Sequence, residues 1–220
     1  MQDFLEVKEV VWHSTGIFEL KARRNGLAFV PGDCLALFGE DGAASRPYSI
    51  ASGQQEEEIR FLIRRMPGGE VSGFLAERKP GDRVKCSPPF GWFRPGPRKD
   101  GAPFVFVATG TGIAPFLAHL RSHPDAPPLK CLYGVRHLAD AVERDWLRGV
   151  CDLRLAVSRE TVEGAAHGRV TDLLDDLPIA PGMHFYLCGL DAMIDDVSQW
   201  LEARGVPVPH IHRECFFNAA

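Results

Sequence analysis

The sequence predicts a β + α/β protein: a six-stranded antiparallel β-barrel of the Greek-key type, followed by a parallel α/β domain. Three observations support this prediction. The first hundred residues contain short apolar or alternating runs that are separated by turn residues. After residue 101 apolar runs alternate with helical patterns. A turn of small residues joins the first of these later runs to a helix, which is typical of parallel α/β folds.

The barrel strands are expected where apolar or alternating runs lie between glycine, proline, asparagine and aspartate clusters. These runs cover residues 4–11, 17–22, 34–38, 48–51, 59–63 and 83–86. A short helix is expected at 71–78. The Gly- and Pro-rich stretch 96–101 predicts a linker, so we expect domains at 1–98 and 102–220.

The second domain is expected to be a parallel sheet that is covered on both faces, because strands and helices alternate. The expected strands cover 104–108, 129–133, 153–157, 184–188 and 210–213. The expected helices cover 113–120, 141–147, 170–174 and 192–203. Ligands of such sheets bind at the carboxyl ends of the strands.

Bulk composition narrows the possible functions. The chain has 220 residues and a net charge of −4, too small an imbalance to favour nucleic acid as a partner. Its six cysteines are scattered, with no CxxC pair and no cluster typical of a metal or iron–sulfur site. No apolar run reaches the roughly 18 residues of a membrane span. We therefore expect a cytoplasmic monomer with reduced thiols, no metal and no membrane span.

Three segments carry candidate chemistry. The stretch Ala108–Pro115 places backbone N–H groups at a helix N-terminus, which suits a phosphate or a plain tight turn. A second glycine turn, Gly68-Gly69, opens a helix that has Ser72 in its first turn. Arg46-Pro47-Tyr48-Ser49 combines a cation, an aromatic ring and a hydroxyl on one extended segment, although an ordinary surface strand would look the same. Two phosphate sites and an aromatic platform fit a dinucleotide that carries a flat ring.

These segments resemble the ferredoxin–NADP reductase family of FAD proteins, and the resemblance covers nearly the whole chain. Six family motifs occur in the family's order: RxYS at 46–49, GGxxSxxL at 68–75, GDxV at 81–84, PxGxF at 89–93, GTGxxP at 110–115 and YxCGxxxM at 186–193. Residues 157–161 and 168–170 are most similar to the bacterial-type flavodoxin/ferredoxin–NADP reductases.

The resemblance implies that the barrel binds FAD. Arg46 would pair with the pyrophosphate, Tyr48 would pack on the isoalloxazine ring, and Ser49 would hydrogen-bond flavin N5. The implied FAD-binding residues are Arg46, Pro47, Tyr48, Ser49, Ile63, Arg65, Gly69, Val71, Ser72 and Phe216. Phe216 and Phe217 stand where family members more often have Tyr and Trp.

The resemblance also implies that the second domain binds NADPH. Ser49, Cys188 and Glu214 are the implied catalytic residues, with Cys188 beside the nicotinamide, although a small apolar strand residue would fit that position equally well. The implied NADP-binding residues are Thr109, Gly110, Thr111, Gly112, Pro115, Arg136, Ser158, Arg159, Arg169, Cys188, Gly189 and Met193.

NADPH is expected over NADH for a chemical reason. NAD sites commonly place an acid about 20 residues after the glycines, where it binds the ribose 2′-OH. Here the corresponding strand ends at Arg136 and has no acid, and Arg159 and Arg169 follow. Three arginines with Ser158 suit a 2′-phosphate. Solvated surface arginines are the alternative.

The expected activity is hydride transfer from NADPH to flavin N5, followed by single-electron transfer to a ferredoxin or flavodoxin. A reductase of free flavin or of an oxygenase is the second possibility. A non-catalytic flavin-binding subunit of a redox complex is a third, which the arginines disfavour.

Overall fold

The computed structural model describes residues 3–99 and 101–216. The chain divides into two compact units. The first runs from the N-terminus to Arg94 and includes Ala114–Ser122. The second consists of Pro95–Ile113 and the chain from His123 onward. The predicted domain boundaries at 98 and 102 stay a prediction.

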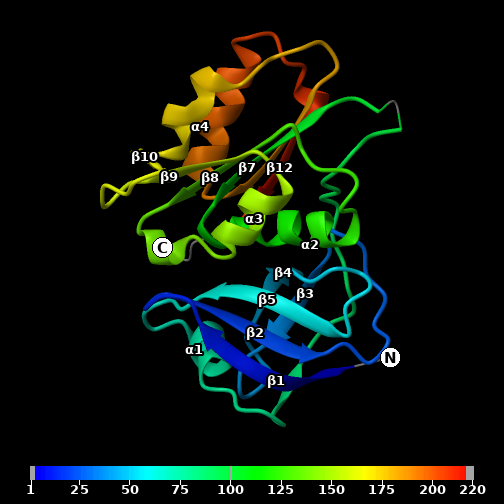
Figure 1. Cartoon of the computed structure of the whole chain (residues 1–220). Coiled ribbons are helices and arrows are strands. Elements are labelled where there is room, and N and C mark those ends of the chain that lie inside the picture. Colours follow the sequence, from blue (N-terminus) through cyan, green and yellow to red (C-terminus); the bar gives the residue numbers. More distant parts are fainter. Residues whose placement is uncertain (1–2, 100, 217–220) are drawn as a thin grey trace. The chain divides into compact units, whose positions relative to one another are not determined.

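The first unit is an antiparallel β structure whose core lies between its strands. The strands are β1 (Phe4–Trp12), β2 (Ile17–Arg23), β3 (Cys34–Phe38), β4 (Ser45–Ser49), β5 (Glu58–Arg64) and β6 (Arg83–Lys85), with helix α1 at Glu70–Ala76. Four strands form a sheet in the order β5-β2-β1-β6, and β3 pairs with β4. Figure 1 shows β1, β2 and β5 side by side.

Isolated bridges join these two sheets into a ring. Leu37 of β3 pairs with Cys86 just after β6, and Ile50 just after β4 pairs with Phe61 of β5. The ring encloses a buried apolar cluster that includes Leu20, which has no exposed surface. The six-stranded antiparallel barrel is therefore confirmed.

The start of β4 differs from the prediction. The apolar pattern predicted a strand at 48–51, whereas β4 begins at Ser45. Arg46 and Pro47 are exposed, so hydropathy gives no strand signal there. The strand exists because its backbone pairs with β3, with Phe38 opposite Ser45 and Cys34 opposite Ser49.

The second unit contains a parallel sheet, as predicted, with six strands where the sequence indicated five. Its strands are β7 (Phe104–Thr109), β8 (Lys130–Val135), β9 (Leu153–Val157), β10 (Ala166–His167), β11 (His184–Gly189) and β12 (Ile211–Cys215), in the order β10-β9-β8-β7-β11-β12. Its helices are α3 (Arg144–Val150) and α4 (Asp191–Glu202), with 3-10 turns η1 (Gly110–Ile113), η2 (Leu138–Asp140), η3 (Val170–Asp176) and η4 (Val208–His210). In Figure 1, α4 covers one face of the sheet and α3 lies on the opposite side.

Three details of this unit were not predicted. The helix expected at 141–147 begins only at Arg144. Glu143 adopts a left-handed φ of 57°, which separates the helix from the turn that precedes it. The segment expected as a helix at 170–174 is the 3-10 helix η3. Strand β10 is two residues long, too short to give a periodic signal.

Helix α2 (Ala114–Ser122) packs in the first unit. The Gln54 N–H donates to Ser122 Oγ at 3.0 Å, and the Arg121 guanidinium donates to the Ala51 carbonyl at 2.9 Å. In the described part of the chain no helix is both long and apolar enough to cross a membrane.

Candidate functional site

Strand β4 presents the arginine, the aromatic ring and the hydroxyl as the sequence predicted. Arg46 is exposed, Tyr48 is half-buried and Ser49 is buried. Burial raises the pKa of Tyr48 to about 12, against the opposing effect of the Arg46 charge, so the phenol stays neutral at physiological pH. A neutral aromatic ring beside an exposed guanidinium fits a flat ring linked to a pyrophosphate.

The Ser49 hydroxyl lies next to the Cys34 thiol, with Oγ and Sγ 3.5 Å apart. The two residues face each other across the β3–β4 pair. The Cys34 sulfur can accept or donate a weak hydrogen bond to the Ser49 hydroxyl. Its role toward flavin N5 stays a prediction.

The glycine turn before α1 is closed by its own serine. Ser72 Oγ accepts the Met66 N–H at 3.1 Å and donates to the Gly69 carbonyl at 3.4 Å. A Cβ on Gly69 would lie 2.7 Å from Ser72 Oγ and 2.8 Å from Met66 Cβ, so only glycine fits there. Ser72 and Val71 are buried, which leaves the backbone N–H groups of the first turn as the donors for a phosphate.

The remaining predicted FAD residues differ in what they can offer. The Ile63 side chain is fully buried in the barrel core, so only its backbone can meet a ligand. Arg65 is exposed, with its guanidinium 3.8 Å from the Glu77 carboxylate. Phe216 is half-buried, and its N–H donates to the Gly189 carbonyl at 2.9 Å. Phe217 lies outside the described residues.

The second site is built where the carboxyl ends of β7 and β11 approach closely. A Cβ on Gly112 would lie 2.3 Å from the Cys188 carbonyl oxygen. A Cβ on Gly189, whose φ is +139°, would lie 2.1 Å from Thr109 Oγ1. Thr109 Oγ1 also accepts the Leu190 N–H at 2.9 Å. Two glycines thus let the two strand ends meet, and backbone N–H groups of the turn can approach a phosphate.

A buried tyrosine that the sequence analysis missed supports this turn. The Tyr133 hydroxyl donates to the Gly110 carbonyl at 3.0 Å and lies 3.2 Å from the Asp140 carbonyl. It holds the turn that contains Gly110 and Thr111 against the end of β8. The sequence placed Tyr133 near the end of the strand that leads to Arg136. A tyrosine within a strand is ordinarily interpreted as a core residue, so no role in the turn was predicted for it.

Cys188 and Glu214 lie on neighbouring strands, in register. The Cys188 thiol donates to Glu214 Oε1 at 3.9 Å. Cys188 is fully buried and Glu214 is partly exposed. The structure thus brings together the Cys188 thiol and the Glu214 carboxylate, two of the three catalytic residues that the resemblance implies.

The predicted arginines gather at the carboxyl ends of β8, β9 and β10. The Arg159 N–H donates to the Arg136 carbonyl at 2.9 Å, which fixes these two residues side by side. Ser158 Oγ donates to the Val135 carbonyl at 3.4 Å. Arg169 follows β10, where its N–H donates to Asp172 Oδ2 at 2.8 Å. The three guanidiniums are on exposed residues, available to an anion.

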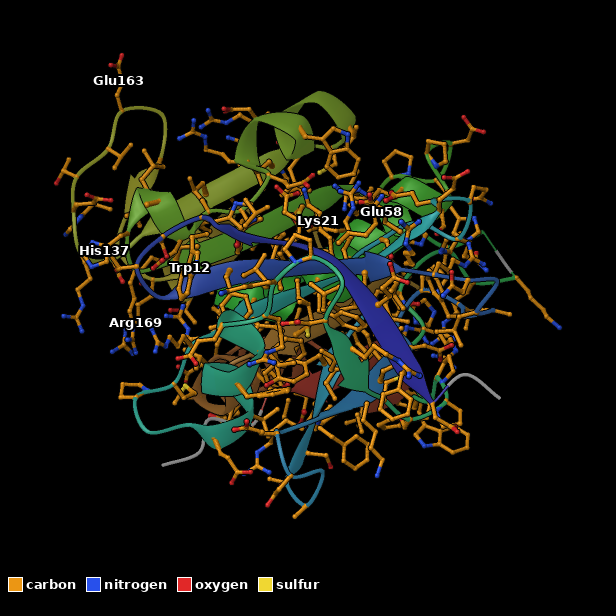
Figure 2. All side chains as sticks on the ribbon, turned by 90° about the horizontal axis from the view of Figure 1, so that it is seen from below. Trp12, Lys21, Glu58, His137, Glu163 and Arg169 are labelled. Carbon is orange, nitrogen blue, oxygen red and sulfur yellow. The ribbon has the colours of Figure 1, made fainter. Side chains whose placement is uncertain are left out.

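Glu160 links these strand ends, and the sequence analysis gave it no role. Its carboxylate accepts the Leu138 N–H, and its carbonyl lies 3.1 Å from His167 Nδ1. Figure 2 shows the side chains of His137 and Arg169 on the same side of the molecule. The loops that carry the arginines are therefore connected to one another by hydrogen bonds.

The last two predicted residues lie in the interior. Met193 is only 6% exposed and packs in the apolar cluster beneath α4. Pro115 is buried in α2. Neither side chain offers a polar group, so each supports the site by packing. Within the described residues, no group of three or more His, Cys, Asp or Glu could hold a metal ion.

Comparisons with known proteins agree with this architecture. The oxidoreductase FAD-binding domain matches residues 4–94, and the oxidoreductase NAD-binding domain matches residues 106–199. The toluate 1,2-dioxygenase electron transfer component of Pseudomonas putida is 34% identical over 210 residues, 90% of this chain and 62% of that protein. Ferredoxin–NADP reductase B of Sorangium cellulosum is 32% identical over 192 residues, 79% of this chain and 78% of that protein.

A solved structure gives the same result. A cytochrome P450 reductase from Amycolatopsis superposes with a TM-score of 0.87 at 28% identity, over 99% of this chain and 71% of that one. The fold and the two matched domains define an oxidoreductase that binds FAD and a nicotinamide dinucleotide. The chain belongs to the ferredoxin–NADP reductase family. It spans about three fifths of the length of the dioxygenase-system relatives that it matches.

Proposed function

We propose that this chain is an NADPH-dependent reductase that passes electrons singly to a protein acceptor serving an oxygenase. The observation that supports this most is the relationship to proteins named as electron transfer or reductase components of dioxygenase systems. This was the second possibility in the sequence analysis, and these relatives favour it over a dedicated ferredoxin or flavodoxin reductase.

The residues of the first unit would hold the flavin. FAD, when bound, accepts a hydride and releases electrons one at a time, which a nicotinamide does not do. Arg46 neutralises the pyrophosphate, Tyr48 packs against the ring system, and the turn at Gly69 supplies backbone donors to phosphate oxygens. Ser49, oriented by Cys34, hydrogen-bonds flavin N5.

The residues of the second unit would hold NADPH. The turn at Gly112 binds the pyrophosphate through backbone N–H groups. The 2′-phosphate is bound by Arg136, Arg159 and Arg169, because three guanidiniums at neighbouring strand ends match the charge of a dianion. The 2′-OH of NADH would find only hydrogen-bond donors there and no acceptor for its proton. Cys188 has no exposed surface, so it would act on the nicotinamide through its backbone and through the Glu214 carboxylate that its thiol contacts.

A second candidate is a ferredoxin– or flavodoxin–NADP reductase. The Sorangium relative carries the ferredoxin–NADP reductase name, and this chain spans 78% of it. Both candidates share the NADPH and FAD chemistry and differ only in the acceptor. Reduction of free flavin and a non-catalytic subunit remain as further alternatives.

Steady-state assays with purified protein would distinguish these candidates. NADPH and NADH oxidation would be measured with ferricyanide, a [2Fe–2S] ferredoxin, the iron–sulfur component of an oxygenase, a flavodoxin and free FMN. We expect NADPH to be preferred and the iron–sulfur proteins to be the fastest protein acceptors. A rate with free FMN that exceeds every protein acceptor would contradict the proposal, as would a lack of NADPH oxidation.

A further inference from the structure

Two acids lie inside the arginine cluster, which consists of Arg136, Arg159 and Arg169 at the ends of β8, β9 and β10. Glu160 directly follows Arg159, and Asp172 comes three residues after Arg169. A carboxylate that paired with one of these guanidiniums would weaken the attraction of the cluster for an anion. The proposed binding of NADPH gives neither acid a role.

The guanidiniums of the arginine cluster have no carboxylate partner. Within residues 3–99 and 101–216, no ion pair involves Arg136, Arg159 or Arg169. Arg154, near the amino end of β9, behaves differently: its Nε lies 3.2 Å from Asp152 Oδ1. The two acids of the cluster therefore use their carboxylates for something other than ion pairs with these arginines.

Asp172 is hydrogen-bonded to the backbone of Arg169. Its Oδ2 accepts the Arg169 N–H at 2.8 Å, and its own N–H donates to the Arg169 carbonyl at 3.0 Å. A Cβ on Gly168, whose φ is +134°, would lie 2.3 Å from the same Oδ2, so the close approach of the carboxylate requires glycine there. The Asp172 carboxylate thus fixes the point where η3 begins and leaves the Arg169 guanidinium unpaired.

Glu160 is hydrogen-bonded to the loop that follows Arg136. Its carboxylate accepts the N–H of Leu138, the first residue of η2. Its carbonyl lies 3.1 Å from Nδ1 of His167 in β10. Glu160 therefore connects the end of β9 to the loop after β8 on one side and to β10 on the other.

A direct contact also joins the end of β8 to the start of η3. A Cβ on Gly134 would lie 2.8 Å from Val170 Cβ, so an added methyl group would push the two segments apart. Gly134 comes two residues before Arg136, and Val170 directly follows Arg169. The packing of these two small neighbours brings the segments that carry Arg136 and Arg169 together.

We propose that Glu160 and Asp172 are positioning residues for the 2′-phosphate of NADPH. They accept backbone N–H groups, which holds the loops of the arginine cluster in place while the guanidiniums stay unpaired. Such preorganisation lowers the cost of ordering the loops when the ligand binds. The inference rests on the proposed use of NADPH and names two residues that set its preference over NADH. Both acids act as hydrogen-bond acceptors, and their negative charge is not required.

The test measures the binding of 2′,5′-ADP and of 5′-AMP to the FAD-loaded protein by calorimetry. The two ligands differ only in the 2′-phosphate, so the ratio of their dissociation constants reports on the arginine cluster. Glu160→Ala and Asp172→Ala should each weaken 2′,5′-ADP binding by about threefold to tenfold and leave 5′-AMP binding unchanged. The KM for NADPH should rise by a similar factor, while kcat and the KM for NADH stay the same.

Conservative variants separate hydrogen bonding from charge. Glu160→Gln and Asp172→Asn keep an oxygen that can accept the same N–H, so each should bind 2′,5′-ADP at least as tightly as the wild type.

Glu163→Ala is the matched control, because Glu163 lies in the same loop between β9 and β10. Among the described residues it makes no hydrogen bond or ion pair, and Figure 2 shows its side chain pointing outward. This variant should bind both ligands like the wild type, since an exposed charge is screened.

Three results would overturn the proposal. If the alanine variants bind 2′,5′-ADP as tightly as the wild type, the acids position nothing. If 5′-AMP binding falls equally, the acids only support the fold. If the Gln and Asn variants are as weak as the alanine variants, the charge matters and the acceptor does not. Failure of the proposed function has a different signature, because the wild-type protein would then bind 2′,5′-ADP no more tightly than 5′-AMP. That result overturns the use of NADPH and this inference together.

Discussion

Replacing Gly112 with alanine tests the close approach of η1 to the end of β11. A Cβ at this position would lie 2.3 Å from the Cys188 carbonyl oxygen and 2.7 Å from the carbonyl carbon. Both neighbours are backbone atoms, so no side-chain rotation can relieve the overlap. Either the turn or the strand must move by about an ångström, a displacement comparable to those that overpacked cores undergo.

The expected cost follows from this geometry. Overpacking typically costs about 1–3 kcal/mol, and a clash with backbone belongs at the upper end, at about 3 kcal/mol. For a unit of this size such a loss lowers the Tm by roughly 10 °C or more. Gly149→Ala is the matched control, because a Cβ there meets nothing within 4 Å and α3 is helical. That variant should be more stable by about 0.5–1 kcal/mol.

The assay combines thermal unfolding with titration of 2′,5′-ADP and of NADPH. Gly112→Ala should melt earlier and bind NADPH more weakly, because the displaced turn carries the pyrophosphate donors. Gly149→Ala should bind both ligands normally. If Gly112→Ala melts with the wild type and binds NADPH equally well, then η1 does not approach the end of β11 as described, and the assignment of the pyrophosphate site fails.

Four further predictions address the cofactors, the specificity and the pH dependence. Cofactor released by heat should co-migrate with FAD, because two phosphate-binding segments serve a pyrophosphate; a single FMN peak refutes this. Arg159→Ala should weaken NADPH binding about tenfold to hundredfold and spare NADH, whereas Arg154→Ala, within β9, should affect neither. Equal losses for both nucleotides count against the 2′-phosphate role of Arg159. Ser49→Ala and Cys188→Ala should each slow flavin reduction about tenfold in stopped-flow experiments, and neither should change the affinity for 2′,5′-ADP. Unchanged reduction rates in variants that still bind FAD would mean that these two side chains only fill space in the protein interior. Burial lowers the pKa of His212 to about 4, so the folded state disfavours the protonated imidazole relative to the unfolded state. The free energy of unfolding should therefore fall as the pH drops from about 6.5 to 4, by about 2 kcal/mol once solvent screening of this partly exposed ring is allowed for. His212→Gln should flatten this dependence in thermal melts at several pH values, and an equally steep fall in the variant would exclude His212 as the cause.

The sequence predicted the architecture well wherever burial dictates the pattern. Phe104 to Val107 are apolar at every position because β7 is buried on both faces, and that run was recognisable as a buried strand. The glycine turn after it was also recognisable, since only glycine permits the approach of Gly112 to Cys188. The buried run of β9 also let the sequence place Arg159 correctly, just after the carboxyl end of that strand.

Features that depend on pairing or on side-chain hydrogen bonds were beyond the sequence. The start of β4 at Ser45 is set by its partner β3 and has no hydropathy signal. The left-handed φ of Glu143 shifts α3, and nothing in a glutamate predicts that conformation. The hydrogen bond from the Met66 N–H to Ser72 Oγ has no sequence signal, and the role of Ser72 toward a phosphate stays a prediction. The hydroxyl of Tyr133 supports the glycine turn only because the fold brings β8 beside it.

We propose that NADPH reduces a flavin held by this chain and that the electrons leave to a protein acceptor. The most direct test is an anaerobic stopped-flow experiment in two stages. NADPH or NADH is first mixed with the FAD-loaded protein, and the loss of visible flavin absorbance is followed; the reduced protein is then mixed with an oxidised [2Fe–2S] protein. We expect bleaching that is faster with NADPH than with NADH, followed by reoxidation of the flavin as the iron–sulfur protein is reduced. A flavin that stays oxidised with both nucleotides, or that is bleached but not reoxidised by any protein acceptor, would contradict it.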